Sequence, residues 1–506
     1  MAPVLLAPWQ GARAQPAVPA SVALPSLGDP ASSDLSPSAE RKLGERAMRE
    51  IRQDPDYLAD PTLTDYINRV GARIAAHMGR YAEDGAPSST ELFAVRDKSI
   101  NAFAMPGGFI GVNTGLLMAA RSEAELAGVL AHETGHVAQR HIARSIAKDS
   151  QSGMLAMASI LLALIAARNS PDAAQAALMF GQGAAAQSQL NYSRDNEREA
   201  DRVGLHLLAD AGYPPSAMVK FFERLQQSTQ LTDSGAFPYL RTHPLTTERI
   251  GDLHARVGKL DATEPFAPEF ALMQGRARVL SETTLDGLRD LRASCRAAVS
   301  AGPGSRPVSL TQRISAQYCE ADASIGLRDW ADAASALAQL TQTMRPYEGQ
   351  APISRELKLL GAELALAQGQ AGEALAQLTP MRAAEPGNRP VAMLQAQAAL
   401  RAGQPEVARE SLQSWVSLHR HDGPAWKQLA LAYNALNQPA AALRANAESL
   451  IIDQQWQPAS EMLERARKVP GTDYYDASII DARLHDVKEH IKEELKENRG
   501  RRAPTG

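Results

Sequence analysis

Residues 122–148 read SEAELAGVLAHETGHVAQRHIARSIAK, and this stretch predicts one long helix. Ser122 is a favourable residue at the start of a helix, and Glu125, three positions later, completes a capping box. Apolar side chains recur on one face and are Leu126, Val129, Leu130 and Val137. We therefore expect this helix to pack into a core.

The same helix carries His132 and His136, with Glu133 between them. Positions i and i+4 lie about 6 Å apart on one face, so both imidazoles can reach one metal ion. Zinc suits such ligands, and Glu133 could then take a proton from an activated water. The alternative is a solvated helix with two surface histidines, which the apolar face disfavours. Gly135 costs about 1 kcal/mol relative to alanine inside a helix, and this predicts a close neighbour at that point.

Two histidines do not complete a zinc site, so a third ligand must come from another segment. The best candidate is residues 196–204, NEREADRVG, which open a second helix. Glu197 and Asp201 share a face of this helix with two small residues, which would let it pack tightly against the first helix. Glu199 points about 160° away from Asp201, so both acids cannot serve one site. A charged, solvated first turn is the alternative reading of this segment.

Short β-like runs precede the histidine-bearing helix. Residues 92–95 and 109–112 are apolar, and residues 101–108 between them read NAFAMPGG. A proline followed by two glycines marks a turn after a strand, and the pattern is compatible with a strand at the edge of a sheet.

With these motifs in place, the chain resembles the HtpX and CAAX-prenyl-protease group of gluzincin metallopeptidases over residues 40–260. The resemblance implies a zincin-type α+β domain with a small sheet and one Zn²⁺ per chain. It assigns the acid that opens the second motif, Glu197, as the third ligand beside His132 and His136. Glu133 becomes the catalytic base, and Asp201 maps to a supporting or proton-donating position.

The resemblance also gives roles to two further segments. One matches the strand ahead of the zinc helix, which pairs with an extended substrate in zincins, and consists of Asn101, Ala102, Phe103 and Ala104. The other is Thr242-His243-Pro244. His243 could be a fourth ligand at the open position of the zinc, could stabilise the transition state, or could have no role.

Other charged and imidazole side chains of this region are expected to be less central. Arg249 could serve the oxyanion, but a pairing with acids on the surface is the preferred reading. His141 follows His136 by five positions, which on a continuous helix lies off the ligand face. His206 and His254 have no ligand spacing and are read as structural.

A 34-residue period organises the second half of the chain. Alanines recur at this spacing in two series, which are Ala362, Ala396 and Ala430, and Ala374, Ala408 and Ala442. Trp426-x-x-Leu429-Ala430-x-x-Tyr433 fits the tetratricopeptide pattern. We predict an α-solenoid with a concave binding face, for which an alanine-rich helical bundle is the alternative.

The predicted organisation is mainly α. Residues 1–37 are a signal-peptide remnant and a disordered segment rich in proline and alanine, in which Ala12-Arg13-Ala14 resembles a cleavage site. The metalloprotease domain occupies 38–260, the repeats 271–495, and a disordered tail 496–506. The apolar run 154–167 is too short to span a bilayer, and it could be a lid, a core helix or a peripheral membrane contact.

Composition excludes several partners and scaffolds. With 53 Lys and Arg against 57 Asp and Glu, the net charge is −4, so no basic excess exists for nucleic acid. Two cysteines exclude a four-thiolate zinc site and a disulfide-stapled scaffold. Cys295 and Cys319 flank one predicted helical hairpin, where they form either a disulfide or two buried thiols.

The first functional hypothesis is a periplasmic, exported zinc endopeptidase with an attached repeat module. Its architecture resembles periplasmic proteases of outer-membrane quality control, which implies unfolded or stalled outer-membrane proteins as substrates and the assembly machinery as a partner of the repeats. The second hypothesis is a non-catalytic chaperone or adaptor with a latent or structural zinc site. Glu133 separates them, because a structural site needs no base.

Overall fold

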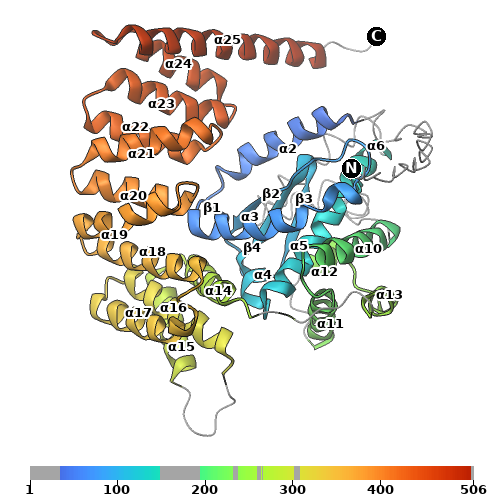
Figure 1. The fold of residues 1–506 in the computed structure, drawn as a ribbon. Coiled ribbons are helices and arrows are strands. Elements are labelled where there is room, and N and C mark those ends of the chain that lie inside the picture. The colour runs from blue at the N-terminus through green and yellow to red at the C-terminus, as the bar shows by residue number, and fades with distance from the viewer. Residues whose placement is uncertain are drawn as a thin grey trace, which may run out of the picture.

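The computed structural model describes residues 35–148, 194–231, 238–258, 264, 266–300 and 308–502. Helices dominate, and one small sheet lies in the N-terminal half (Figure 1). This confirms the mainly α fold predicted from the sequence, with a sheet-containing part followed by a helical repeat region. The residues 1–34 and the apolar run 154–167 lie outside the described residues.

The sheet has four strands in the order β1-β2-β4-β3. They are β1 (Tyr57–Leu58), β2 (Glu91–Val95), β3 (Ala102–Met105) and β4 (Phe109–Asn113). β2 pairs with β4 in parallel, and the β1–β2 and β3–β4 pairs are antiparallel, with Ala104 opposite Ile110. β3 is therefore an edge strand of this sheet, as the sequence pattern suggests.

Helices cover both faces of the sheet. The strand residues alternate between two apolar clusters, as the two-residue period of a strand requires. Leu92 and Ala94 face the main core, where α3 (Pro61–Ala75) and α5 (Glu123–Ala138) pack. Phe93 and Val95 face a smaller cluster built with α2 (Pro37–Ile51).

The predicted single helix over 122–148 is two helices. α5 ends at Ala138, Arg140 adopts a left-handed conformation with φ 47°, and α6 (His141–Lys148) follows. The Arg140 side chain is buried and reaches the backbone oxygen of Leu35 at 2.9 Å and the carboxylate of Glu40 at 3.2 Å. We attribute the break to this anchorage, because a straight helix would direct the side chain elsewhere.

The start of α5 is capped as predicted in one direction only. Ser122 Oγ accepts from the backbone N–H of Glu125 at 3.3 Å. The Glu125 carboxylate accepts from the backbone N–H of Arg121 at 2.6 Å instead of that of Ser122. The reciprocal bond of a capping box is therefore displaced by one residue.

The described residues of the first half contain five further helices. They are α4 (Thr114–Ala119), α10 (Arg194–Asp210), α11 (Ser216–Leu231), α12 (Pro238–Thr242) and α13 (Thr247–Val257). Short 3₁₀ turns are η1 (Met78–Arg80) and η2 (Pro106–Gly108). α10 and α11 pack directly against α5, which places the two histidines of α5 between neighbouring helices.

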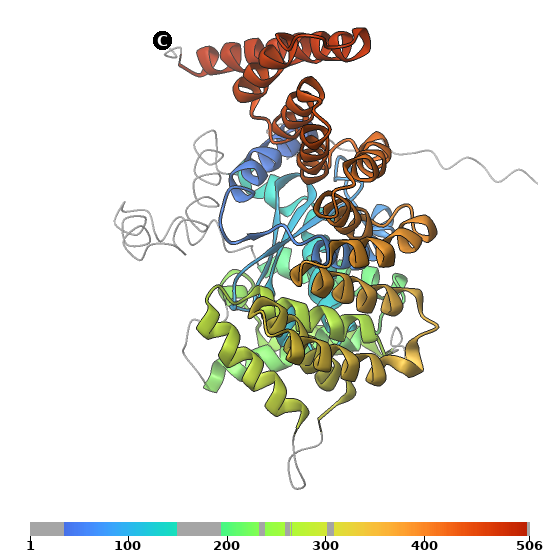
Figure 2. The same cartoon turned by 90° about the vertical axis from the view of Figure 1, so that its left-hand side faces the viewer.

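Helices of the second half stack beside the sheet, as both views show (Figures 1 and 2). They are α14 (Pro268–Leu280), α15 (Leu285–Val299), α16 (Leu310–Gly326), α17 (Trp330–Met344), the 3₁₀ turn η3 (Arg345–Tyr347), α18 (Ala351–Ala367), α19 (Ala371–Ala384), α20 (Arg389–Arg401), α21 (Pro405–Leu418), α22 (Gly423–Ala435), α23 (Pro439–Ile452), α24 (Trp456–Arg467) and α25 (Tyr474–Arg502). α25 extends into the segment from 496 for which the sequence predicts disorder. Pairs such as Lys492–Glu489, one turn apart, support this helix.

The 34-residue period is visible in the backbone. Gly369, Gly403 and Asn437 are spaced by 34 residues, and all three have positive φ, at 82°, 70° and 55°. Each lies just after the first helix of a pair, where a left-handed residue ends a helix. All six alanines of the two sequence series are buried. These features support regular helix pairs, and the tetratricopeptide assignment itself stays a prediction.

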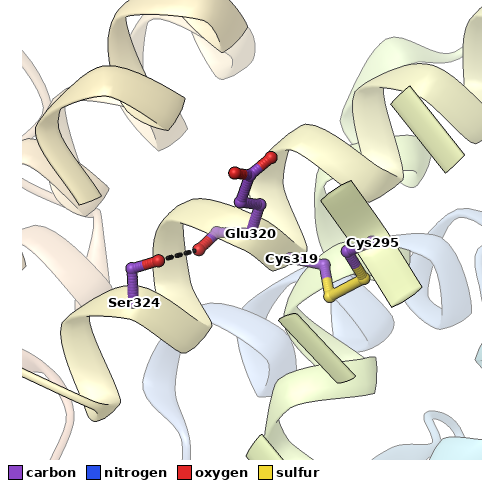
Figure 3. Close-up of a disulfide and its surroundings, with 4 residues drawn as sticks. All are labelled: Cys295, Cys319, Glu320 and Ser324. Atoms are coloured by element: carbon purple, nitrogen blue, oxygen red, sulfur yellow. Dashed lines mark hydrogen bonds between the residues drawn. A yellow bond between two sulfur atoms is a disulfide. The ribbon is translucent and has the colours of Figure 1, made fainter. Parts of the chain in front are cut away.

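Cys295 and Cys319 form a disulfide that joins α15 to α16 (Figure 3). The sequence left a bridge and two free thiols as alternatives, and the structure has the bridge. The cysteines are 24 positions apart. A crosslink that closes a loop of this length stabilises the folded chain by about 3 kcal/mol.

The repeat helices touch the first half at several places, two of which lie far apart along the solenoid. On α14, Arg276 pairs with Asp60 at the start of α3, at 2.6 Å. At the other end, the backbone oxygen of Gln454 accepts from Arg49 on α2, at 3.3 Å. A cleft of about 1130 Å³ lies beside this second contact, lined from α2, the sheet and α21–α25. In the described parts of the chain, no helix is both long and apolar enough to cross a bilayer.

Candidate metal centre

Four buried side chains converge beneath the sheet edge, from three segments distant in sequence. They are His132 and His136 on α5, Glu197 on α10, and His243 just after α12. One ligand atom from each lies within 4.8 Å of all the others. All the candidate ligands singled out from the sequence are therefore brought together, although their roles as ligands stay a prediction.

The distances fit a single small cation. His132 Nε2 lies 3.1 Å from His136 Nε2, and each lies 3.5 Å from an oxygen of Glu197. His243 Nδ1 lies 3.0 Å from Glu197 Oε1 and 3.4 Å from His132 Nε2. Ligands held at about 2 Å from a tetrahedral zinc ion are about 3.3 Å from one another. The nitrogen and oxygen donors therefore already have the spacing of such a shell.

Glycines set the distance between the two helices that bear the ligands. A Cβ atom on Gly135 of α5 would lie 2.9 Å from the Ala200 oxygen of α10. A Cβ atom on Gly204 of α10 would lie 3.1 Å from the Ala131 oxygen of α5. The close neighbour predicted for Gly135 is thus the backbone of α10, and the contact brings Glu197 up to the histidines.

Asp201 supports the cluster from behind. One of its oxygens lies 3.0 Å from His132 Nδ1, the nitrogen turned away from the convergence point. Both oxygens accept from Arg249 on α13, at 2.7 and 2.8 Å. Arg249 also lies 2.8 Å from Glu197 Oε2 and is only 3% exposed. The surface pairing preferred for Arg249 from the sequence is therefore wrong, because its acidic partners belong to the buried centre.

Glu133 is fully buried beside the ligands. Its Oε2 accepts from the backbone N–H of Ala104 on the edge strand β3 at 3.0 Å, and its Oε1 lies 3.6 Å from His243 Nε2. Burial raises the pKa of Glu133, although the neighbouring histidines oppose the shift. A carboxylate with a raised pKa exchanges protons more readily near neutral pH, as a general base must.

The buried side chains of the centre carry an excess of negative charge, which favours the binding of a cation. Three carboxylates, those of Glu133, Glu197 and Asp201, are buried here, and among the described residues the guanidinium of Arg249 pairs with the last two. Burial alone would lower the pKa of His132, but Asp201 and Glu197 raise it to about 9. The His132 imidazole then carries a proton, which offsets part of the negative charge. Burial holds the pKa of His136 well below its usual value. A divalent cation would neutralise the excess negative charge of the carboxylates, and the neutral imidazole of His136 could bind it.

Further aromatic and imidazole side chains escaped the sequence analysis. Tyr239 stacks on His243 with ring centres 4.8 Å apart, and its buried hydroxyl has no hydrogen-bond partner among the described residues. His141 was expected off the ligand face, but its Nδ1 lies 2.8 Å from His136 Nδ1. The break at Arg140 carries it there. No spacing rule could have found Tyr239.

The other residues in question lie outside the centre. Glu199 is not one of the four convergent side chains; it contacts Arg144 at 2.9 Å and His141 at 3.2 Å. His206 stacks on Tyr81, and His254 pairs with the exposed Glu223.

Residues 61–257 match the sequence profile of peptidase family M48. This part of the chain is similar to the peptidase family M48. The family is one of metallopeptidases, which agrees with the convergent donor set and the buried base. The match spans strands β2–β4, α5, α10 and the His243 segment, and so includes every residue of the centre.

Relatives extend the similarity beyond this domain. The beta-barrel assembly-enhancing protease of Escherichia coli is 28% identical over 468 residues, which cover 92% of this chain and 91% of that protein. A Vibrio cholerae protein that carries the same name provisionally is 36% identical over 260 residues, about half of each chain. The mitochondrial metalloendopeptidase OMA1 of Schizosaccharomyces pombe is 32% identical over 224 residues, 43% of this chain and 61% of that protein.

Proposed function

We propose that the protein is a zinc-dependent endopeptidase of the bacterial periplasm that acts in outer-membrane protein assembly and degrades misassembled outer-membrane proteins. The observation that carries the proposal is the buried donor set of His132, His136 and Glu197 with Glu133 beside it. Zinc fits this set because it prefers nitrogen and oxygen donors at these distances.

The chemistry of the reaction follows from the positions of the side chains. A zinc ion supplies Lewis acidity and makes a water more acidic in such a site. Glu133 takes the proton of the attacking water and delivers it to the leaving amine. Asp201 holds the His132 ring in place, and Arg249 holds Asp201.

The edge strand provides a way to bind an extended substrate. Among the described strands β3 pairs with β4 alone, and on its other side the backbone N–H of Ala104 faces the centre, where it donates to Glu133. An extended peptide can add to such an edge by β-augmentation. Asn101, Ala102, Phe103 and Ala104 are thus proposed to align the substrate. Unfolded β-barrel strands suit this mode, because their own edges are unpaired.

The compartment and the partners are supported by separate observations. Relatives that match most of this chain are named for β-barrel assembly. The Cys295–Cys319 disulfide is typical of proteins from an oxidising compartment such as the periplasm. The repeat helices, with their cleft beside α2, are proposed to contact the assembly machinery or its clients.

One observation favours the second candidate, a chaperone or adaptor with a latent zinc site. His243 lies close enough to the other donors to be a fourth ligand, and four protein ligands would close the site. Under this reading the repeats would perform the main task and cleavage would be rare.

The decisive experiment compares the wild type with Glu133→Gln. We expect the variant to keep its zinc and to lose at least 100-fold in the cleavage of casein and of an unfolded outer-membrane β-barrel, because the base is gone. Metal content is measured by mass spectrometry and cleavage by peptide release. Undiminished cleavage by Glu133→Gln would refute the assignment.

Two controls sharpen this experiment. Glu410→Gln makes the same substitution at an exposed site of the repeats and should cleave like the wild type. His243→Ala distinguishes the candidates, because its activity rises if His243 closes the site and falls if His243 stabilises the transition state. A folded β-barrel, which has no free edge, should resist cleavage.

A further inference from the structure

The two histidines of α5 differ in what holds their outer nitrogens. His132 Nδ1 faces the carboxylate of Asp201 at 3.0 Å, which is the usual partner of a metal-binding histidine. His136 Nδ1 instead faces a second imidazole, Nδ1 of His141, at 2.8 Å. The inner nitrogen of His136, Nε2, points toward His132 and Glu197.

The contact continues beyond His141. Its Nε2 lies 3.2 Å from Glu199 Oε2. That same oxygen accepts from Arg144 at 2.9 Å, and the other oxygen of Glu199 accepts from Arg202 at 3.3 Å. A carboxylate between two guanidinium groups is an acceptor only, so the row of side chains ends on a group that cannot donate.

Because Glu199 only accepts, it determines which ring nitrogens of His141 and His136 carry a hydrogen. Nε2 of His141 therefore carries the hydrogen and donates it. A neutral His141 then offers a lone pair at Nδ1, and Nδ1 of His136 must donate to it. The lone pair of His136 is thereby left on Nε2, directed at the other candidate ligands. The reverse order would place a hydrogen on Nε2 and prevent metal binding.

Local structure places His141 for this task. The left-handed Arg140, with φ 47°, ends α5 and turns the chain, so that His141 starts α6 beside the preceding turn. Both histidine rings are fully buried. Water is therefore excluded as a substitute partner for the outer nitrogen of His136.

We propose that His141 is a positioning residue, which with Glu199 fixes the tautomer and ring orientation of His136 for metal binding. This inference rests on the proposed metal centre and extends it to a second pair of side chains. It predicts that the affinity for zinc depends on a residue that does not itself contact the metal.

The test measures the dissociation constant for zinc directly, by competition with a chromogenic chelator. His141→Phe keeps an aromatic ring but removes the acceptor, and we expect affinity to fall by roughly 10- to 100-fold, as for other outer partners of metal ligands. His141→Asn places an amide oxygen near the position of Nδ1 and should recover most of the loss. The cobalt-substituted protein should show shifted absorption bands in His141→Phe and near-normal bands in His141→Asn.

His206→Phe is the matched control, because His206 is an imidazole on α10 that stacks on Tyr81 away from the centre. It should bind zinc like the wild type. Thermal unfolding of each metal-free variant checks folding. If His141→Phe does not fold, Glu199→Ala serves instead, since it frees the tautomer from farther away and should also weaken binding.

Wild-type affinity in a folded His141→Phe or Glu199→Ala variant would overturn the inference. So would equal losses in the Phe and Asn variants that merely follow their loss of thermal stability. Zinc binding is measured without substrate, so these outcomes are distinct from a failure of the proposed function, which Glu133→Gln tests by cleavage.

Discussion

At the scale of single residues, the centre is a balance of buried charges. Arg249 contacts both Asp201 and Glu197 through its guanidinium group. Removal of such a group destabilises the fold by more than its own attraction, because the carboxylates that it leaves behind are buried and keep only imidazole neighbours.

Arg249→Met is expected to destabilise the metal-free protein by about 3–5 kcal/mol, since two buried carboxylates lose their partner. Zinc should restore part of the loss, because a cation compensates the same charges. The measurement is the thermal midpoint in chelator and in excess zinc. Arg256→Met, at an exposed position of the same helix α13, is the control. Equal midpoints for the Arg249 variant and the wild type in chelator would contradict this account.

The sequence predicted the candidate metal ligands, but not all of the side chains that hold them in position. His132, His136 and Glu197 could be predicted because helical spacing and residue type are local properties. His141 and Arg249 could not, because their positions depend on the turn at Arg140 and on how α13 packs against α10. A continuous helix was the natural expectation for 122–148, since the buried anchor of Arg140 lies on α2, about 100 residues earlier in the chain.

At the scale of elements, the repeats are joined by recurring caps. Asn388 and Asp422, spaced by 34 residues, are the N-caps of α20 and α22. Asp422 also accepts two bonds from Arg389, at 2.7 and 2.9 Å, and one from Trp415 Nε1 at 2.9 Å. One carboxylate thus ties three successive helices, and the period found in the sequence is partly the period of these caps.

Asp422→Asn should lower the stability of the repeats by about 1–3 kcal/mol at pH 7, because the bonds to a charged acceptor are weakened. Burial would raise the pKa of Asp422, but Arg389 lowers it below its usual value. A folded pKa below the unfolded one gives stability that is present above about pH 4 and is lost as the pH falls through the folded pKa. The difference in the free energy of unfolding between the wild type and Asp422→Asn, measured by urea unfolding, should therefore become smaller below pH 4.

The control for this experiment is Asp286→Asn, which alters an exposed pair with Arg289 on α15. Exposed pairs contribute little, so its stability should match the wild type at every pH. If the difference in unfolding free energy between the wild type and Asp422→Asn stayed constant from pH 7 to pH 3, the pair of Asp422 with Arg389 would not be its source.

At the scale of the whole molecule, the repeat helices are fastened to the metallopeptidase part through a buried ionic cluster. Arg276 on α14 reaches Asp60, the N-cap residue of α3, at 2.6 Å and Glu363 of α18 at 2.9 Å. It also donates to the hydroxyl of Tyr318 at 2.9 Å. A single side chain thereby connects three parts of the chain that are far apart in sequence.

Arg276→Met is expected to loosen this connection, because it leaves two partly buried carboxylates, those of Asp60 and Glu363, without this counter-charge. We expect a lower thermal midpoint and a larger radius of gyration in X-ray scattering, with zinc affinity unchanged. Arg278→Met on the same helix, where the described residues show no ion pair for Arg278, should leave both quantities as in the wild type. Unaltered scattering and midpoint in Arg276→Met would show that other contacts hold the halves together.

The contact of α5 with α10 has an evolutionary consequence. Main-chain atoms meet main-chain atoms at Gly135 and Gly204, so the separation of the two helices does not depend on which side chains fill the surrounding interior. Neighbouring positions can drift over generations while the ligand spacing is inherited unchanged. Tolerance to mutation should therefore be lowest at two residues that have no side chain at all.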